Sequence, residues 1–296
     1  MSLLAIKQAS ALVSLLRISE FLKLKFLKYL DGRYFQIVFL VSLLLFGALA
    51  RDFSLTAWQV LLTFCSAVGS QAAWQFVLKL PNRHNISGYL SALVSTCGIA
   101  ILVRSDVLWV HPLLACLAMS SKFLLRFGEG KNRGHILNPA NLAAFSAMMF
   151  IPHAWLSPGQ WGQETLAGLW MLALGATVTG RIKRWDVSLT FLTAWLGLLA
   201  ARLFWLDYAP SLALDMWLHQ ALNGATILFA FFMISDPMTT PQHARARMAY
   251  AVCVAASAFV WQYYLFKPQG LIVALFAWSF TVPIWNKLFK EQRFNW

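Results

Sequence analysis

Residues 34–50 read YFQIVFLVSLLLFGALA and contain no charged side chain. A helix that crosses the hydrocarbon core of a bilayer needs about 20 mainly apolar residues, so this stretch predicts a membrane helix. Nine more stretches of similar character predict ten segments that cross or re-enter the membrane. The ten stretches are residues 34–50, 55–78, 88–103, 107–125, 136–152, 164–180, 186–206, 218–235, 247–266 and 269–288.

The composition of the whole chain agrees with a membrane protein. Of its 296 residues, 59% are hydrophobic and 12% are charged, whereas soluble domains contain about 45–50% apolar and about 25% charged residues. This excludes a soluble globule and a disordered chain. The four cysteines lie in apolar runs without CxxC spacing, so we expect no iron–sulfur centre, haem attachment or metal site. The N-terminus lacks the pattern of a cleavable signal peptide.

The basic residues indicate how the chain is oriented. If the N-terminus is cytoplasmic and the loops alternate, all 24 Lys and Arg residues except Arg51, Arg104, Arg202 and Lys267 fall on the cytoplasmic side. Basic loops stay in the cytoplasm, so both termini are expected there, in a bacterial-type inner membrane. The net charge of +13 then reflects basic loops beside an anionic leaflet of the lipid bilayer and not a nucleic-acid partner.

Residues 1–30 differ from the ten stretches because lysines and arginines interrupt their leucines and phenylalanines. This pattern predicts an amphipathic helix in the cytoplasmic interface, with a partner-binding helix as the alternative. Residues 31–296 then form a ten-helix membrane domain. Ten crossings divide into two repeats of five, and a repeat with an odd number of crossings is inverted in the membrane relative to its copy. We therefore expect an all-α integral membrane fold with inverted repeats at about 34–155 and 160–290.

Polar segments interrupt the apolar stretches at three places. In the first, Asn138-Pro139-Ala140-Asn141 begins the fifth stretch, and Arg126 lies upstream. Asn138 can cap the helix, and a capped helix start with basic neighbours offers donors to an anionic or polar ligand. Simple capping is the alternative interpretation.

The second polar segment, residues 157–165, places Glu164 at the start of the sixth stretch. The helix dipole favours a carboxylate at this position, which is the structural interpretation. The functional interpretation is a contact with a cation or a proton.

The third polar segment runs from Asn223 and Thr226 to Asp236-Pro237 and Thr240. A proline biases the residue before it away from helical geometry, so Asp236 ends the eighth stretch. Its carboxylate belongs either to a structural turn or to a ligand pocket or ion path.

Four motifs in order resemble the RnfD membrane component of Rnf-type electron-transport complexes and its homologue, the NqrB component of sodium-translocating NADH:quinone reductases. The motifs are KFLLR at 122–126, GHILNPAN at 134–141, GQET at 162–165 and FFMISDPMT at 231–239. The resemblance covers about residues 88–290. It implies an inverted five-plus-five fold like that of urea channels. It also implies a redox subunit that carries flavin within the membrane and couples electron transfer to cation movement.

Members of that family attach a covalent flavin to the threonine of a D-x-x-[ST]-G-A-T motif, between the asparagine–proline element and the G-x-E-T element. The interval from Leu142 to Gly162 contains no threonine. The GAT sequences at 175–177 and 224–226 lie elsewhere and lack the aspartate. The resemblance therefore implies a non-covalent flavin, either FMN or riboflavin, or a quinone.

The sequence thus predicts a membrane electron-transfer subunit that binds flavin or quinone within a larger redox complex, with cation movement as a coupled step. Electrons must come from other subunits, because the sequence has no dinucleotide-binding GxGxxG segment. A channel or transporter for a small polar solute and a non-catalytic membrane anchor for redox partners are the alternatives. The expected cofactor-binding residues are Arg126, Asn138, Asn141, Asn223, Thr226, Asp236 and Thr240, and the expected ion-path residues are Glu164 and Asp236.

Overall fold

The computed structural model of the chain describes residues 31–50, 54–79, 86–128, 134–157 and 165–294. This part of the chain is mostly helical, as the apolar stretches predict. The amphipathic helix predicted for residues 1–30 and the predicted ion-path residue Glu164 lie outside the described residues.

Each of the ten apolar stretches coincides with a helix or with a pair of consecutive helices. The helices of the first half are α2 (Gly32–Ala50), α3 (Ala57–Val77), α4 (Ile86–Leu102), α5 (Val110–Leu124) and α6 (Pro139–Phe150). Those of the second half are α7 (Thr165–Arg181), α8 (Trp185–Trp205), α9 (Pro210–Ala221), α10 (Gly224–Leu228), the π-helical turn η2 (Phe229–Met233), α11 (Ala244–Tyr263), α12 (Gly270–Ser279) and α13 (Val282–Leu288).

The eighth stretch, predicted as one segment over 218–235, is divided in the structure. The separate helix α9 ends at Ala221, and Asn223 caps α10 by accepting a hydrogen bond from the Ala225 backbone N–H at 2.9 Å. Hydropathy does not reveal this break because the residues on both sides of Asn223 are mainly apolar. The cap brings a polar side chain to the start of a buried helix.

Length and hydropathy identify three of the described helices, α2, α3 and α8, as able to cross a membrane. The pair α12 and α13, which meet at a bend of 50°, forms a fourth candidate span. Helices α4, α5, α6 and the continuous α10–η2 segment are apolar but shorter. The chain therefore has the helices of a multi-pass membrane protein, and the count of ten crossings remains a prediction.

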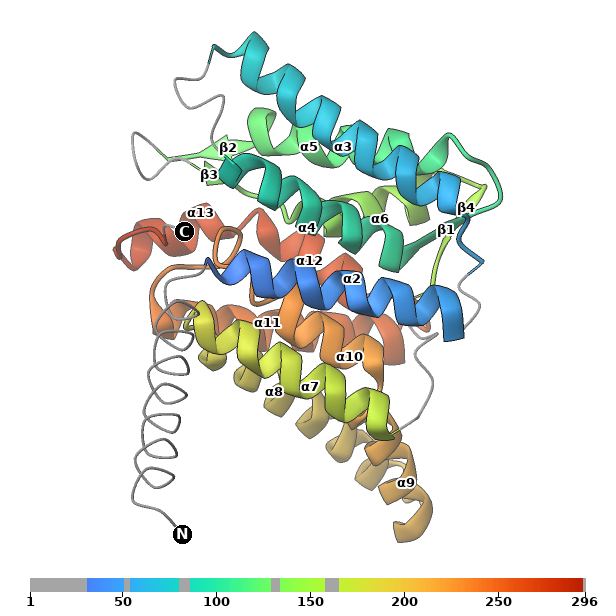
Figure 1. Ribbon diagram of the computed structural model, residues 1–296. Coiled ribbons are helices and arrows are strands. Elements are labelled where there is room, and N and C mark those ends of the chain that lie inside the picture. Colours follow the sequence, from blue (N-terminus) through green and yellow to red (C-terminus); the bar gives the residue numbers. More distant parts are fainter. Residues whose placement is uncertain (1–30, 51–53, 80–85, 129–133, 158–164, 295–296) are drawn as a thin grey trace, which may run out of the picture.

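Four short strands lie at the ends of the helices. Strand β1 (Val103–Ser105) pairs antiparallel with β4 (Ala154–Leu156), and β2 (Arg126–Phe127) pairs antiparallel with β3 (Gly134–His135). Figure 1 shows the two pairs at opposite ends of the bundle. This pairing gives hydrogen-bond partners to backbone that has left the helices, which an apolar environment requires.

Helices of the two halves have matching neighbours. Helix α3 packs against α5 as α8 packs against α11, α5 packs against α6 as α11 packs against α12, and α2 packs against α4 as α7 packs against α10. The halves meet where α2 contacts α7 and where α6 contacts α12. Figure 1 shows α2 and α12 in the middle of the bundle.

The buried stripes of two matching helices differ in chemistry. On α3 every fourth residue is buried and most of the stripe is polar: Gln59, Thr63, Ala67, Gln71 and Gln75. On α8 the stripe is largely aromatic and aliphatic: Val187, Ser188, Phe191, Trp195, Leu199 and Leu203. The first half therefore brings hydrogen-bonding groups into the bundle, whereas the second half brings large apolar ones.

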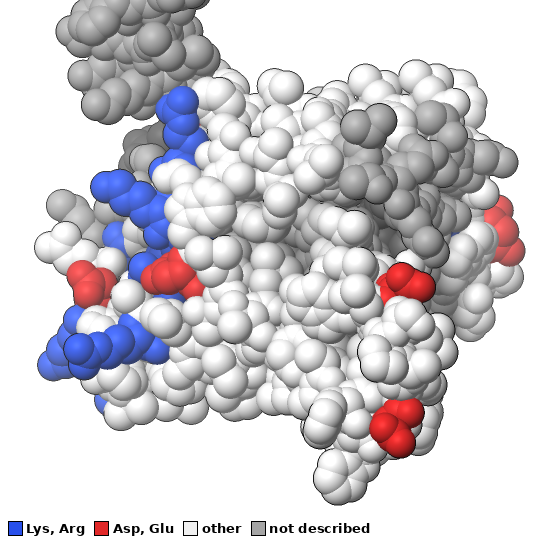
Figure 2. All heavy atoms as spheres, turned by 90° about the horizontal axis from the view of Figure 1, so that it is seen from below, with Lys and Arg blue, Asp and Glu red and all other residues white. Residues whose placement is uncertain are grey.

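Charged side chains are sorted along the helix axes. Figure 2 shows the lysines and arginines gathered at one end of the molecule, with a broad uncharged surface beside them. We call this the basic end. It contains the N-terminal end of α2, which carries Arg33, and the C-terminal ends of α5 and α7, which carry Lys122 and Arg181.

Candidate functional site

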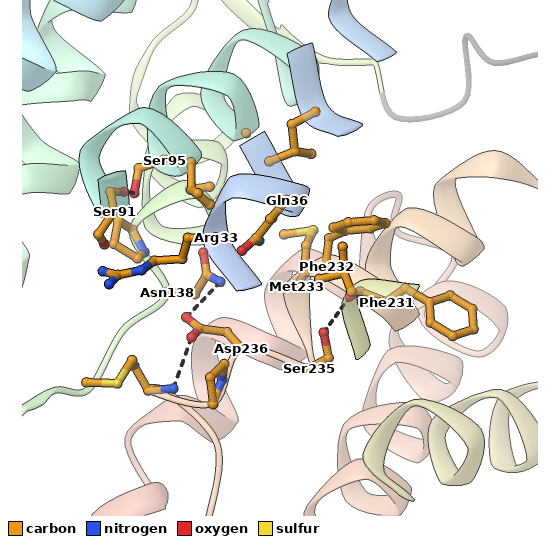
Figure 3. Close-up of a pocket in the computed structure, with 18 of the residues that line it drawn as sticks. Arg33, Gln36, Ser91, Ser95, Asn138, Phe231, Phe232, Met233, Ser235 and Asp236 are labelled. Atoms are coloured by element: carbon orange, nitrogen blue, oxygen red, sulfur yellow. Dashed lines mark hydrogen bonds between the residues drawn. The ribbon is translucent and has the colours of Figure 1, made fainter. Parts of the chain in front are cut away.

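A small cavity opens among α2, α4, α6 and η2, near the basic end. Its polar lining includes Arg33 from α2, Ser91 and Ser95 from α4, and Asn138 and Asp236 from the breaks that precede α6 and follow η2. Figure 3 shows these side chains around it, with Phe231 and Phe232 on the apolar side. We call this space the basic-end cavity.

Two helix breaks are joined inside the basic-end cavity. The Asn138 side chain accepts a hydrogen bond from the Asn141 backbone N–H at 3.1 Å, which caps α6, and Pro139 occupies the first turn. The Asn138 amide Nδ2 donates to Asp236 Oδ2 at 3.3 Å (Figure 3). The cap expected from the sequence is therefore confirmed, and the same side chain binds the carboxylate of the second break.

The Asp236 carboxylate is well supplied with donors. The Met238 backbone N–H and the Thr239 hydroxyl each donate to it at 3.0 Å, in addition to Asn138. The Thr240 hydroxyl donates to the Asp236 backbone carbonyl at 2.8 Å. Burial raises the pKa of the carboxyl group above its ordinary value, although these donors and nearby arginines act in the opposite direction.

A buried arginine fixes the segment that follows Asp236. Arg184, which precedes α8 and is 3% exposed, donates to Gln242 Oε1 at 2.8 Å and to the carbonyl oxygens of Pro241 and Pro237 at 3.3 and 3.5 Å. Gln242 in turn donates to the Pro237 carbonyl at 2.9 Å. The irregular backbone from 234 to 243 is thus tied to the start of α8.

A second and larger cavity lies at the opposite end of α10–η2. Its polar lining comprises Gln220, Asn223, Thr226, Gln262, Gln269, Ser157 and the indole of Trp195, and none of the described residues that line it is charged. Its apolar walls include Phe229 and Ile272. We call this space the uncharged chamber.

Two residues that line the uncharged chamber have unusual surroundings. The indole Nε1 of Trp195 is buried and has no hydrogen-bond partner among the described residues, although Trp195 is only 1% exposed. At the opposite wall, a Cβ on Gly270 would lie 2.5 Å from the Ala258 carbonyl oxygen, so glycine lets α12 begin close against α11.

Three residues belong to the lining of both cavities. Leu102, Leu228 and Met233 border the basic-end cavity on one side and the uncharged chamber on the other. All three are at least 95% buried. They form an apolar barrier between two polar spaces, and Met233 lies in the π-helical turn, where helix geometry is locally altered.

The two cavities differ in the ligands that they can hold. The basic-end cavity has a volume of about 80 Å³, which is room for a few water molecules and too little for a three-ring flavin. The uncharged chamber has a volume of about 430 Å³, within the range of pockets that take small organic ligands.

The residues expected from the sequence to bind the cofactor are divided by this geometry. Asn223 and Thr226 line the uncharged chamber, and Asn138 and Asp236 line the basic-end cavity. Thr240 is buried beside Asp236.

Besides Thr240, two of the expected residues are absent from both linings. Arg126 is in β2, and Asn141 is 1% exposed and donates to the Ile272 carbonyl at 3.2 Å. Sequence reasoning does not find Trp195, Gln262 or Gln269, because one tryptophan among apolar residues and two isolated glutamines give no pattern.

Comparisons with known proteins relate the second half of the chain, which contains the motifs at 162–165 and 231–239, to the family that these motifs resemble. A model of the NQR2, RnfD, RnfE family matches residues 156–295. The D component of the ion-translocating oxidoreductase complex of Escherichia fergusonii is 29% identical over 147 residues, which are 49% of this chain and 36% of that protein. The protein of the same name from Escherichia coli O1:K1 is 31% identical over 147 residues with the same coverage.

The match covers part of each protein. The chain spans 36% of the length of these relatives. The matched region contains the helix break at Asp236, the uncharged lining of α10 and α12, and Arg184. Residues 156–295 therefore carry the pattern of the NQR2, RnfD, RnfE family, the family that the motifs of this chain resemble.

Proposed function

We propose that this chain is a membrane subunit of a multi-subunit redox complex, in which it passes electrons by way of a non-covalently bound flavin or quinone ring. We further propose that this transfer is coupled to the movement of a cation. The relatives are named as subunits of an ion-translocating oxidoreductase complex. The observation that carries the proposal is the uncharged chamber, lined by side-chain amides and by Phe229, in a chain whose residues 156–295 match this family's model.

The chamber has the groups needed to hold an uncharged ring. The side-chain amides of Asn223, Gln262 and Gln269 line it and supply both donors and acceptors. Phe229 offers an aromatic face for packing. A bound flavin or quinone ring supplies electron transfer, while the protein orients the ring and keeps water from it. The electron donor and acceptor are partner subunits.

Coupling to a cation is supported by the arrangement of the two cavities. Asp236 lies in the basic-end cavity, and the three apolar residues Leu102, Leu228 and Met233 line both that cavity and the chamber. Both cavities lie at helix breaks, which is where membrane proteins hold ions and substrates. Glu164 remains a further candidate for the ion path.

The proposed topology has ten crossings, two inverted repeats at about 34–155 and 160–290, and both termini in the cytoplasm of a bacterial cell. The matching helix neighbours of the two halves support the repeats. The gathering of lysines and arginines at one end supports the orientation (Figure 2). A reporter that is active only in the cytoplasm, fused after the C-terminus, tests this placement.

The cofactor assignment is tested by measuring bound flavin and quinone per chain in complexes purified from membranes. The variant Trp195→Phe replaces a buried indole of the chamber wall by a smaller phenyl ring, and we expect it to lose most of the bound ring compound. The matched control Trp278→Phe removes an indole that donates to Ser257 at 2.8 Å and lies outside the chamber. Equal cofactor content in both variants and in the wild type would contradict the assignment.

A channel for a small polar solute is the second candidate, and one observation favours it. The uncharged chamber and the basic-end cavity share the lining residues Leu102, Leu228 and Met233, as adjoining vestibules of a neutral-solute channel would. Stopped-flow light scattering with glycerol on vesicles that contain the full chain distinguishes the two functions. Rapid glycerol entry together with no bound chromophore would favour the channel.

A further inference from the structure

A lysine is buried beside the basic-end cavity without an acidic partner. Lys122 lies in the last turn of α5 and is 9% exposed. Its Nζ donates to Ser91 Oγ at 3.1 Å and to Gln71 Oε1 at 3.3 Å, and none of the ion pairs among the described residues includes it. Burying an ammonium group costs free energy unless polar groups surround it, so this position requires hydrogen-bond acceptors from the protein.

The hydrogen-bond acceptors around the ammonium group are neutral side-chain oxygen atoms. Gln71 and Gln75 belong to the polar stripe of α3 and are 3% and 6% exposed. A Cβ on Gly88 would lie 2.7 Å from the Nε2 atoms of both glutamines, so this glycine makes room for the two amides. The Gln75 Oε1 atom has no hydrogen-bond partner among the described residues.

Ser91 connects Lys122 with the basic-end cavity, which Ser91 lines together with Asp236 (Figure 3). The carboxylate already accepts three hydrogen bonds, from Asn138, Met238 and Thr239. It is the only carboxylate among the described residues that line the cavity. A metal cation would therefore find few free anionic oxygen atoms there, although hard cations require several oxygen ligands.

Other cationic and titratable groups face the same region from each neighbouring element. They are Arg33 of α2, which is ion-paired with Asp31, and Arg126 of β2, His135 of β3, Arg184 before α8 and Arg293 near the C-terminus. Burial and the charges of Lys122, Arg293 and Arg126 lower the pKa of His135 to about 3, so this ring stays neutral at ordinary pH. The region is therefore rich in positive charge, which disfavours an additional metal cation.

We propose that Lys122 is the resident cation of the basic-end cavity and that the ion which this cavity exchanges is a proton, not Na⁺ or another metal cation. The proposal rests on the proposed coupling to cation movement. In the exchange, an N–H bond of the ammonium group breaks, Ser91 Oγ takes that proton, and the Ser91 hydroxyl releases its own proton to water in the cavity. The neutral amine then takes up another proton, so charge and atoms balance.

The test uses vesicles reconstituted with the complex that contains the full chain. Proton entry is driven by a potassium diffusion potential and followed with a pH-sensitive dye, and ²²Na⁺ uptake is measured in parallel. We expect wild-type vesicles to take up protons and to take up ²²Na⁺ no faster than protein-free vesicles. The variant Lys122→Arg keeps the positive charge but cannot release a proton, so its proton entry should fall to the protein-free rate.

Two controls make the result decisive. Lys287→Arg, near the end of α13, changes a lysine outside this cavity and should leave proton entry unchanged. Bound flavin and quinone measured in the same preparations report the proposed redox function separately. Three results would each overturn the proposal: proton entry in Lys122→Arg equal to that of the wild type, no proton entry in the wild type, or ²²Na⁺ uptake by the wild type above the protein-free rate. In each case, an unchanged cofactor content would mean that the proposed redox function still holds.

Discussion

The Asn138 amide donates to the Asp236 carboxylate across 3.3 Å, and this bond joins two helix breaks that are 98 residues apart in the sequence. One break begins α6 and the other follows η2, so the bond connects the two halves of the bundle. Both residues line the basic-end cavity. The polar centre of this end of the molecule therefore depends on a contact between the halves.

Replacing Asn138 by alanine should destabilise the protein more than replacing Asn223. Both residues cap a helix, and the loss of a cap costs about 1 kcal/mol. Asn138→Ala also removes a hydrogen bond to a charged group, which adds about 1.5–3 kcal/mol. Thermal unfolding in detergent measures the difference, and equal midpoints for the two variants would show that the bond to Asp236 contributes nothing.

Arg184→Lys should also destabilise the protein, although the charge is retained. Lysine cannot reproduce the fork that contacts Gln242 and two proline carbonyl oxygens, and the expected loss is about 2 kcal/mol. Arg245→Lys, at an exposed position of α11, should change stability by less than about 0.5 kcal/mol. If the unfolding midpoint decreased equally in both variants, the loss of stability would come from replacing arginine by lysine in general and not from the contacts of Arg184.

Stability should decline in acid through His135. The pKa of its ring is about 3 in the folded protein and 6.5 when exposed, so the unfolded chain binds the proton more readily. Above pH 6.5 the histidine therefore does not reduce the free energy of unfolding. As the pH falls from 6.5 toward 3, that free energy decreases progressively. His135→Asn should flatten the loss of thermal stability between about pH 6.5 and about pH 4.5, whereas His219→Asn, exposed on α9, should retain the wild-type slope.

Met233→Ala should open the barrier between the two cavities. The side chain is 5% exposed and lines both spaces, so its truncation joins them. We expect faster glycerol entry into vesicles than with the wild type, together with a stability loss of about 2–5 kcal/mol. The control Met248→Ala, 42% exposed on α11, should leave the flux unchanged. A wild-type flux in folded Met233→Ala would mean that other residues close the passage.

Helix positions could be predicted from the sequence because apolar runs are long and the charges between them are sparse. The separation of α9 from α10 could not, since Asn223 is one polar residue between apolar neighbours. Hydropathy also cannot decide how many of the shorter helices cross the membrane. Only α2, α3, α8 and the bent α12–α13 pair have sufficient length and hydropathy among the described residues.

The site could be predicted where local chemistry leaves a mark in the sequence. Asn138 and Asp236 each precede a proline, which indicates a helix break, and both line the basic-end cavity. The sequence places Lys122 near the cytoplasmic end of the 107–125 stretch. It does not reveal that this lysine is buried, because the burial depends on Gln71 and Ser91, which lie 51 and 31 residues away. The uncharged chamber could not be predicted, since it draws single residues from several separate helices.

The central claim is that a redox-active ring is bound without a covalent bond. The most direct test is the visible and ultraviolet spectrum of the complex purified in mild detergent, recorded before and after acid precipitation, with solvent extraction of quinone. The account predicts a flavin or quinone signal in the intact complex that passes into the supernatant or extract. A colourless complex without extractable quinone, or a flavin that stays with this chain in the pellet, would contradict it.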